Sequence, residues 1–466
     1  MSRMEQDFLG QREIADDIYY GVQTIRGKEN FHITGIPMSQ EPYFVKALGL
    51  VKKAAAQTNR DLGVLDAKVA DAIIKGCDRV IAGEMMDQFV TDFIQGGAGT
   101  STNMNANEVI ANLALEALGF TKGEYQHVNP NDHVNYGQST NDTYPTAFRL
   151  ALILRLESYM TALRQLQEAF FAKGREFDRV LKMGRTHLQD AVPMSLGAEF
   201  RGWGTTIGEE VERITEVRQL LREVNLGATA IGTSVTAAPG YPSLAVRHLS
   251  ALTGIDFVLA SDLVEATSDT GAYVQLSGVL KRTAVKLTKI CNDIRLLASG
   301  PRCGLNEINL PQLQPGSSIM PGKVNPVIPE VVNQTSFLVI GLDTTVTLAA
   351  SAGQLQLNVM EPVISFALFF SIRTMERAVN SLRENCIVGI TANEEHARSM
   401  VLNSLGIVTV LKPLLGYEQC AEIAREGYRT GRSLHHIVVI ERKLLTQEKW
   451  DEMFSFERLI NPDLIA

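Results

Sequence analysis

Residues 316–326 bring together groups that can move a proton beside a carboxylate, and we call this segment, near residues 315–326, the serine loop. A glycine is followed by Ser317 and Ser318, and the cation Lys323 and the amide Asn325 come soon after. Glycine and a Pro-Gly pair favour a loop that bends freely. Such a loop can remove a proton next to a carboxylate and hold the developing negative charge. The serine pair alone is also typical of a surface turn, so the prediction depends on the whole string.

A second polar segment, residues 95–105, contains a run of glycines that leads to Thr100. Glycines let a ligand approach the backbone closely, and the hydroxyl and amide side chains bind without adding charge. The segment lacks the G-x-G-x-x-G spacing and the following Lys-Ser/Thr of nucleotide-binding loops. We therefore interpret it as a loop that suits a dicarboxylate rather than a nucleotide.

A third segment, Ser139-Thr140-Asn141, precedes Pro145. Because proline suits the first turn of a helix, we expect the three residues to lie just before a helix N-terminus. Free backbone N–H groups and the positive end of the helix dipole attract a carboxylate there. Asn141 and the two residues after it would equally suit helix capping, and both roles remain open.

A fourth segment, residues 184–193, places Thr186 and His187 beside Arg185. A neutral histidine can accept a hydrogen bond from an ammonium group, whereas a protonated one cannot. A single histidine is more often a structural hydrogen-bond partner, and Arg185 suits an internal salt bridge at least as well as a substrate. Glu330 is either a partner for His187 or a favourable charge at a helix N-terminus.

The sequence around these segments predicts long helices that must position them. Residues 145–173 contain almost no helix breaker, apolar residues recur every three or four positions over 207–224, and another helical segment spans 273–299. These patterns predict a mainly α protein with a central helical bundle. Helices of this length expose several faces, so we expect a homo-oligomer that buries the remaining apolar stripes.

The pattern also predicts the domain organisation. We expect a mixed, mainly helical N-terminal domain over residues 1–140 and a central helical bundle over 141–395 that carries the serine loop. After a Gly-Ile-Thr-Ala-Asn stretch the helical pattern shortens, which predicts a small helical C-terminal domain over residues 396–466.

Composition limits the partners. The chain has 466 residues and a net charge of −8, which argues against nucleic acid or an anionic membrane surface as the main partner. The N-terminus lacks the apolar core of a signal peptide, and no apolar run is long enough to span a bilayer. Five cysteines are dispersed without metal-binding spacing. We therefore expect reduced thiols and a cytoplasmic protein.

The four segments, in this order and spacing, resemble the aspartase/fumarase superfamily, and the resemblance extends over essentially the whole chain. Residues 96–101 (Gly-Gly-Ala-Gly-Thr-Ser) and 327–334 (Val-Ile-Pro-Glu-Val-Val-Asn-Gln) are more similar to the aspartate ammonia-lyase branch than to fumarases. Ala198 departs from the pattern, since many relatives have glutamine there. The resemblance implies a three-domain fold whose central long-helix bundle forms the helical core of a homotetramer, with active sites built from three subunits.

The implied reaction is the reversible deamination of L-aspartate to fumarate and ammonium, through abstraction of the Cβ proton and an aci-carboxylate intermediate. Ser317 is implied as the general base. The residues that the resemblance assigns to substrate binding are Thr100, Ser139, Thr140, Asn141, Thr186, His187, Ser318, Lys323 and Asn325. No redox or organic cofactor is implied; activation by Mg²⁺ is compatible with the resemblance, but no ligand cluster places the ion. The alternatives are a fumarate hydratase and a catalytically silent structural homologue.

Overall fold

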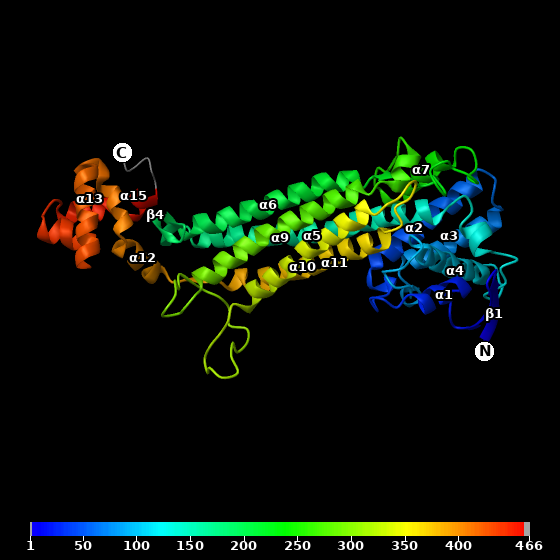
Figure 1. The fold of residues 1–466 in the computed structure, drawn as a ribbon, viewed down its shortest axis with the longest axis horizontal. Helices are drawn as coiled ribbons and strands as arrows, with labels where there is room; N and C mark the ends of the chain where they lie inside the picture. Colours follow the sequence, from blue (N-terminus) through cyan, green and yellow to red (C-terminus); the bar gives the residue numbers. More distant parts are fainter. Residues whose placement is uncertain (1, 461–466) are drawn as a thin grey trace. The chain divides into compact units, whose positions relative to one another are not determined.

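The computed structural model describes residues 2–460 and confirms the prediction of a mainly helical protein (Figure 1). The chain forms two compact units. Unit 1 comprises Met1–Thr161, Glu212–Ala284 and Phe337–Glu376; unit 2 comprises Ala162–Val211, Val285–Ser336 and Arg377–Ala466. Five long helices have residues in both units: α5 (Thr140–Glu176), α6 (Leu196–Leu220), α9 (Gly271–Leu297), α10 (Val327–Ser351) and α11 (Glu361–Asn385). The predicted segment 145–173 lies within α5, and most of 207–224 and of 273–299 lies within α6 and α9. The helices end earlier than expected, at Leu220 and Leu297, and residues 223–224 form a strand. The three-domain division itself stays a prediction.

The start of α5 differs from the expectation. Pro145 lies inside the helix rather than in its first turn, and the helix begins at Thr140. The reason is a replacement hydrogen bond: proline cannot donate to the carbonyl four residues back, and that carbonyl, of Asn141, accepts instead from Nδ2 of Asn225 at 3.1 Å. Thr140 and Asn141 therefore belong to the first turn, with Ser139 just before it.

The core of unit 1 is aromatic and helical. It packs α2 (Pro42–Asp61), α3 (Ala67–Ile81), α4 (Thr100–Ala117) and α7 (Tyr241–Thr253) with parts of the long helices. The ring of Phe148 on α5 lies 4.5 Å from that of Tyr273 on α9 and 5.4 Å from that of Phe369 on α11. Phe44 on α2 and Tyr144 on α5 join the same cluster, with ring centroids 5.1 Å apart. Large aromatic rings stabilise such contacts between helices because they bury a large apolar area and because edge-to-face pairs of rings attract each other.

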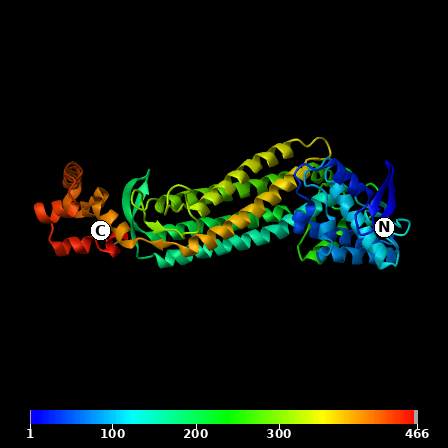
Figure 2. The same ribbon diagram turned by 90° about the horizontal axis from the view of Figure 1, so that it is seen from below.

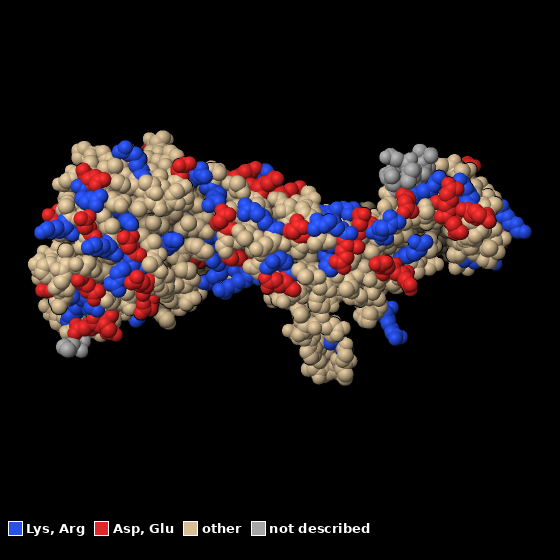
Figure 3. All heavy atoms as spheres, turned by 180° about the vertical axis from the view of Figure 1, so that it is seen from behind, with Lys and Arg blue, Asp and Glu red and all other residues tan. Residues whose placement is uncertain are grey.

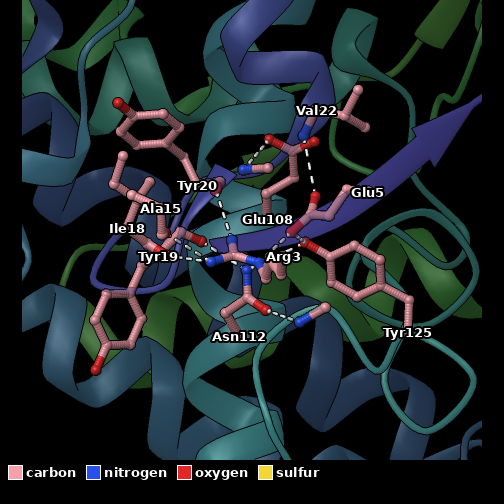
Figure 4. A network of polar contacts seen from close by, with 12 residues as sticks. Arg3, Glu5, Ala15, Ile18, Tyr19, Tyr20, Val22, Glu108, Asn112 and Tyr125 are labelled. Carbon is pink, nitrogen blue, oxygen red and sulfur yellow. Dashed lines mark hydrogen bonds and ion pairs between the residues drawn. The ribbon is translucent and has the colours of Figure 1, made fainter. Parts of the chain in front are cut away.

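The N-terminal hairpin of unit 1 is attached through buried carboxylates (Figure 4). Strands β1 (Ser2–Asp7) and β2 (Gly10–Ala15) pair antiparallel, and α1 (Val22–Asn30) follows. Glu108 of α4 accepts from the backbone N–H groups of Gly21, Gln23 and Thr24, and Glu5 of β1 accepts from that of Val22. The two carboxylates thus bond donors at the N-terminus of α1 that have no partner within the helix.

Unit 2 contains a hairpin that supports one of the candidate segments. Strands β3 (Leu181–Thr186) and β4 (Gln189–Ser195) pair antiparallel, with a shift in register between Met183 and Arg185. Leu181 and Met183 belong to the same buried cluster as apolar residues of the C-terminal helices, beside which Figure 2 shows the hairpin. Those elements are α12 (Glu394–Asn403), η5 (Leu405–Leu411), α13 (Lys412–Thr430), η6 (His436–Glu441), α14 (Gln447–Met453) and α15 (Phe456–Ile460).

Short elements complete the fold. Strands β5 (Glu223–Val224) and β6 (Val258–Leu259) pair parallel, and β7 (Ile308–Asn309) and β8 (Thr391–Ala392) pair antiparallel. The remaining elements are η1 (Met38–Gln40), η2 (Met86–Gln88), η3 (Pro130–Val134), α8 (Leu263–Ser268) and η4 (Ile387–Gly389). Basic and acidic side chains are interspersed on the face seen in Figure 3. Within residues 2–460, no single helix is long and apolar enough to cross a membrane, although the bent pair Glu394–Asn403 and Leu405–Thr430 passes by length and composition.

Candidate active site

The glycine-rich segment places Thr100 at the first position of α4. Gly99 precedes it in the left-handed region at φ 89°, and the Thr100 hydroxyl donates to the Gly97 carbonyl at 2.7 Å. The side chain of Gln95 stabilises the start of α4. It donates to Oγ1 of Thr102 at 2.8 Å and accepts from the backbone N–H of Thr102 at 3.1 Å. The glycines thus serve a tight turn that ends at the N-terminus of α4, where the positive end of the helix dipole favours a carboxylate.

The third segment, Ser139-Thr140-Asn141, caps α5 and forms its N-terminus. The Ser139 hydroxyl accepts from the N–H of Asn141 at 3.2 Å, and Oδ1 of Asp142 accepts from the N–H of Ser139 at 3.0 Å. This reciprocal pair is a capping box, with aspartate in place of the usual glutamate. Asp142, one of the two residues after Asn141, therefore does take part in capping, as the sequence allowed. The Asn141 side chain donates to the Ala230 carbonyl at 2.7 Å, and its amide oxygen remains an acceptor.

Asn103 joins these two segments. Its Nδ2 donates to Oγ1 of Thr140 at 3.2 Å and to Oδ1 of Asn135 at 3.2 Å, so a residue of the first turns of α4 holds the first residue of α5. Thr100, Ser139, Thr140 and Asn141 therefore belong to two helix N-termini that are tied together, and we call these four residues the helix-terminus cradle. The arrangement supplies hydroxyls, amides and two positive dipole ends for an anion.

Two buried ionisable groups, Lys52 and Asp142, bond residues around the cradle, and the sequence analysis gave Lys52 no role. Lys52 of α2 donates to Asn135 and to Gln138, each at 2.9 Å, and Asp142 accepts from the N–H groups of Gly227 and Thr229. Burial lowers the pKa of Lys52 to about 7, against the charge of Asp142. Burial also raises the pKa of Asp142 to about 6, against its backbone hydrogen bonds. Lys52 lies among the buried, mostly apolar positions of α2. A lysine at such a position was the feature of the sequence that could have indicated a buried polar partner.

The fourth segment forms the tip of the β3–β4 hairpin in unit 2. His187 and Leu188 are the two turn residues, with φ values of 54° and 61°, which is the geometry of a type I′ turn. Such turns favour asparagine and glycine, so a histidine and a leucine are held there at a cost in backbone strain. The side chains of Thr186 and His187 are exposed at this tip. Thr186, His187 and Leu188 are called the hairpin tip below.

The neighbours of the hairpin tip settle one of the alternatives. Arg185 forms a salt bridge, Nη1 to Oε1 of Glu307 at 2.6 Å, so the internal ion pair is confirmed. Glu330 lies in the first turn of α10, and its carboxylate is 3.7 Å from Arg295. Among the residues that the structure describes, no hydrogen bond joins Glu330 to His187, and the partnership between them stays a prediction.

The serine loop is the yellow-green loop that projects downward from the helices in Figure 1. Two bonds close its base: the N–H of Gly316 donates to the Lys323 carbonyl at 2.6 Å, and Nδ2 of Asn325 donates to the Gly316 carbonyl at 2.7 Å. Within the loop, Oγ of Ser317 accepts from the N–H groups of Ile319 at 3.2 Å and Met320 at 3.0 Å. Two backbone donors on one hydroxyl oxygen stabilise negative charge on that oxygen.

The ten candidate residues thus fall into two groups. The helix-terminus cradle belongs to unit 1, whereas the hairpin tip and the serine loop belong to unit 2. Within residues 2–460, no hydrogen bond or ion pair joins the hairpin tip to the serine loop, and Lys323 is exposed and forms no ion pair. Nor does that part of the chain bring three His, Cys, Asp or Glu side chains into a group that could hold a metal ion.

Comparison with known families decides where this geometry belongs. Residues 10–341 match the family model described as Lyase, and residues 407–461 match the one described as Fumarase C C-terminus. The chain belongs to the aspartase/fumarase superfamily of lyases. The family prediction made from the four polar segments is therefore confirmed.

Individual relatives place the chain within that superfamily. Proteins named aspartate ammonia-lyase are 55% identical in Helicobacter pylori (99% of this chain, 98% of the relative) and 57% identical in Pseudomonas aeruginosa (100% and 98%). The Escherichia coli K12 protein of that name is 56% identical (99% and 96%). The chain is thus 55–57% identical, over nearly its full length, to proteins named aspartate ammonia-lyase.

Solved structures share the fold. A fumarate lyase:delta crystallin from Brucella melitensis, bound to cobalt, has a TM-score of 0.96 and 52% identity, covering 99% of this chain and 100% of that one. A class II fumarase from Schistosoma mansoni has a TM-score of 0.92 and 35% identity with the same coverage. The fold is therefore shared by both branches, and fold alone does not separate the two reactions.

Proposed function

We propose that the chain catalyses the reversible deamination of L-aspartate to fumarate and ammonium. The observation that carries the assignment is full-length identity of 55–57% to proteins named aspartate ammonia-lyase in several bacteria. The prediction of a carbon–nitrogen lyase is confirmed by these relatives. The roles of single residues given below are our proposal, supported by the local geometry of each segment.

Ser317 is the general base that removes the Cβ proton. A serine hydroxyl is a weak base, so its alkoxide must be stabilised before it can take a proton from carbon. The hydrogen bonds from the N–H groups of Ile319 and Met320 to Oγ of Ser317 support this role, because they would strengthen as negative charge develops on that oxygen. Closure of the exposed loop over substrate would exclude water and strengthen them further.

The carboxylate next to the reacting carbon becomes dianionic as the proton leaves. We assign it to the hydroxyls of Ser139, Thr140 and Ser318, together with backbone N–H groups of the closed serine loop. The capping box and the Asn103 bond to Thr140 support this assignment, since they hold two of these hydroxyls at the start of α5. Each well-placed donor contributes roughly 3 kcal/mol of transition-state stabilisation.

The second carboxylate is assigned to Lys323 and Asn325, assisted by Thr186. The ammonium ion of Lys323 is exposed and without an ion-pair partner in residues 2–460, so it is available for a substrate carboxylate. The substrate ammonium is assigned to three acceptors, Thr100, Asn141 and neutral His187. The chemistry proposed here uses no redox or organic cofactor, and it is compatible with activation by Mg²⁺ at an unassigned position.

We propose a homotetramer whose active sites combine segments from three subunits. Helix α10 supports an assembly, because its apolar side chains Val331, Phe337, Leu338 and Leu348 are 43–64% exposed. An exposed apolar stripe on a long helix is typical of an interface with another copy. We also place the enzyme in the cytoplasm, which agrees with its five free cysteines, four of them buried.

The test is to follow fumarate by its ultraviolet absorbance while purified protein is given L-aspartate or L-malate in separate reactions. A rise with aspartate alone, matched by ammonia release, is the expected result. A rise with malate alone would make the protein a fumarate hydratase and contradict the assignment. No reaction with either substrate by a correctly assembled protein would favour the catalytically silent homologue.

A further inference from the structure

Glu307 is a buried carboxylate to which the sequence analysis assigned no role. Its side chain is 0% exposed, and it lies between two cations of β3: Oε1 is 2.6 Å from Nη1 of Arg185, and Oε2 is 3.1 Å from Nζ of Lys182. Lys182 is itself 3% exposed and also contacts Glu199 at 2.5 Å. A buried carboxylate needs such partners, because an unpaired charge in the interior is strongly unfavourable. The group therefore ties β3 to the segment that follows α9.

The contacts of β3 with Glu307 lie immediately before the hairpin tip. Arg185 is adjacent to Thr186, and the register shift between Met183 and Arg185 lies between the two cations. Gly184 occupies this shift because a Cβ there would lie 2.9 Å from the Val192 carbonyl oxygen. An irregularity of this kind re-aims the residues that follow it. The bend that sets the direction of Thr186 and His187 therefore lies next to the two residues that pair with the Glu307 carboxylate.

The strain at the hairpin tip needs an anchor. Two consecutive non-glycine residues at positive φ, His187 and Leu188, cost roughly 1–2 kcal/mol each, and Leu188 is exposed, so packing does not hold it. Such conformations persist only where the surrounding structure over-determines them. On one side β4 is held by a hydrogen bond from Ser404 to Asp190 at 2.7 Å. On the other side β3 is held by the Glu307 ion pairs.

The backbone of Glu307 is anchored a few residues before the serine loop. Its N–H donates to the Leu297 carbonyl at the end of α9, and its carbonyl accepts from the N–H of Asn393, each at 2.9 Å. Strand β7 follows at Ile308–Asn309 and pairs with β8, and residues 310–315 then connect it to the serine loop. One residue thus holds the strand before the hairpin tip by its side chain, and its main chain holds the segment that leads to the serine loop.

We propose that Glu307 is a positioning residue for the reaction: through its ion pairs with Lys182 and Arg185 it fixes the place and direction of the hairpin tip relative to the segment that carries the serine loop. This proposal rests on the proposed function, in which His187 accepts a hydrogen bond from the substrate ammonium. Glu307 acts only through its neighbours and does not contact substrate. Loss of the Glu307 charge loosens the hairpin tip. It weakens the binding of the substrate ammonium group more than the binding of the substrate carboxylates.

The experiment compares Arg185→Lys and Glu307→Gln with a matched control, Arg179→Lys, in the full-length enzyme. Arg179 forms an ion pair with Glu457 in the same unit, but both side chains are more than half exposed. Such an exposed pair contributes little to stability. Arg185→Lys keeps the positive charge beside Glu307 and is the milder change. It allows the test to be made on a folded protein if Glu307→Gln proves too destabilising. Hydrogen exchange measured by mass spectrometry over residues 181–195 gives the exchange rate of the hairpin. Peptides from α2 and α4 show whether the exchange rate changes elsewhere in the protein.

The functional readout is the reverse reaction, with the KM for ammonium and the KM for fumarate measured separately. We expect faster exchange in the hairpin and an ammonium KM raised on the order of tenfold, because a displacement of about 1 Å can cost up to a hundredfold. The fumarate KM should rise much less, because Thr186 only assists Lys323 and Asn325 at the carboxylate, and the control variant should keep both KM values of the parent enzyme. A merely structural defect would instead lower the amount of assembled enzyme and leave the ratio of the two KM values unaltered.

His187→Gln separates the failure of this proposal from that of the proposed function. Hairpin exchange that is unchanged in both Arg185→Lys and Glu307→Gln overturns the proposal whatever the kinetics. Faster exchange with an unchanged ammonium KM also overturns it if His187→Gln raises that KM. If His187→Gln leaves the ammonium KM unchanged as well, the assigned role of His187 is wrong, whereas faster exchange still supports the hold of Glu307 on the hairpin.

Discussion

Gly99→Ala tests whether close packing holds the helix-terminus cradle in place. Gly99 has φ 89°, and a Cβ there would lie 2.3 Å from Cδ2 of Tyr144. The ring cannot retreat easily, since Tyr144 is fully buried, bonds Ser365 at 2.9 Å and packs against Phe44. The left-handed backbone costs roughly 1–2 kcal/mol for alanine, and overpacking a buried site costs about 1–3 kcal/mol. We expect a loss of about 2–5 kcal/mol in the free energy of unfolding.

Gly83→Ala is the matched control. Gly83 has nearly the same backbone conformation, φ 84°, but a Cβ there would meet nothing within 4 Å. It should therefore cost only the backbone term of roughly 1–2 kcal/mol. Urea denaturation of both variants, measured in parallel with the parent enzyme, isolates the overlap with Tyr144 as the difference between them. Gly99 also precedes Thr100, so the KM for L-aspartate should rise on the order of tenfold in Gly99→Ala alone.

Two results would refute this reasoning. Equal loss of stability in the two variants would mean that the ring or the loop moves aside at no cost. An unchanged KM in a destabilised Gly99→Ala enzyme would mean that the position of Thr100 does not matter for substrate, and Thr100 would leave the list of ammonium acceptors.

Three further predictions concern single groups. Ser317→Ala should lower kcat by several orders of magnitude with unchanged assembly by size-exclusion chromatography; near-normal turnover would remove Ser317 as the base. Lys323→Ala should raise the KM for L-aspartate about 10- to 100-fold in steady-state kinetics, because a hydrogen bond to a charged group contributes about 1.5–3 kcal/mol; an unchanged KM would rule out the carboxylate clamp. Burial raises the pKa of Glu361 from 4.5 to about 8, against the charge of Arg149, so the folded state holds a proton that the unfolded state releases. The stabilising contribution of Glu361 is fully present below about pH 4.5 and is lost as pH rises to about 8, and Glu361→Gln should flatten this decline in urea midpoints; the same decline in the variant would assign it to another group.

The candidate segments could be predicted from sequence because their chemistry is local. Glycines before Thr100, the Ser-Thr-Asn run before a long helix and the serines before Lys323 are visible as residue types at short spacing. The capping box at Ser139 and the hydrogen bonds inside the serine loop also join neighbours in the chain, which is why they agree with the capping and the turn that the sequence allowed. The helix start near Pro145 was misplaced because the compensating donor, Asn225, is remote in sequence.

The groups that sequence reasoning missed all have distant partners. Lys52 bonds Gln138, which is 86 residues away, and Glu307 pairs with Arg185, which is 122 residues away. Periodicity reports which face of a helix is apolar but not which helix covers it, so a charged residue on such a face has no visible partner in the sequence. Neither the pKa shift of Lys52 nor the burial of Glu307 follows from its neighbours along the chain.

The sequence by itself therefore determined the family, the helical class and the identity of the polar segments, since these depend on residue types and short spacings. Only the tertiary structure decided that α4 and α5 begin side by side through Asn103, that the hairpin tip is a strained two-residue turn, and that Glu307 anchors the strand before it. The physical reason is that hydrogen bonds and ion pairs of buried groups are set by which elements pack together, and packing brings together residues that the chain keeps far apart.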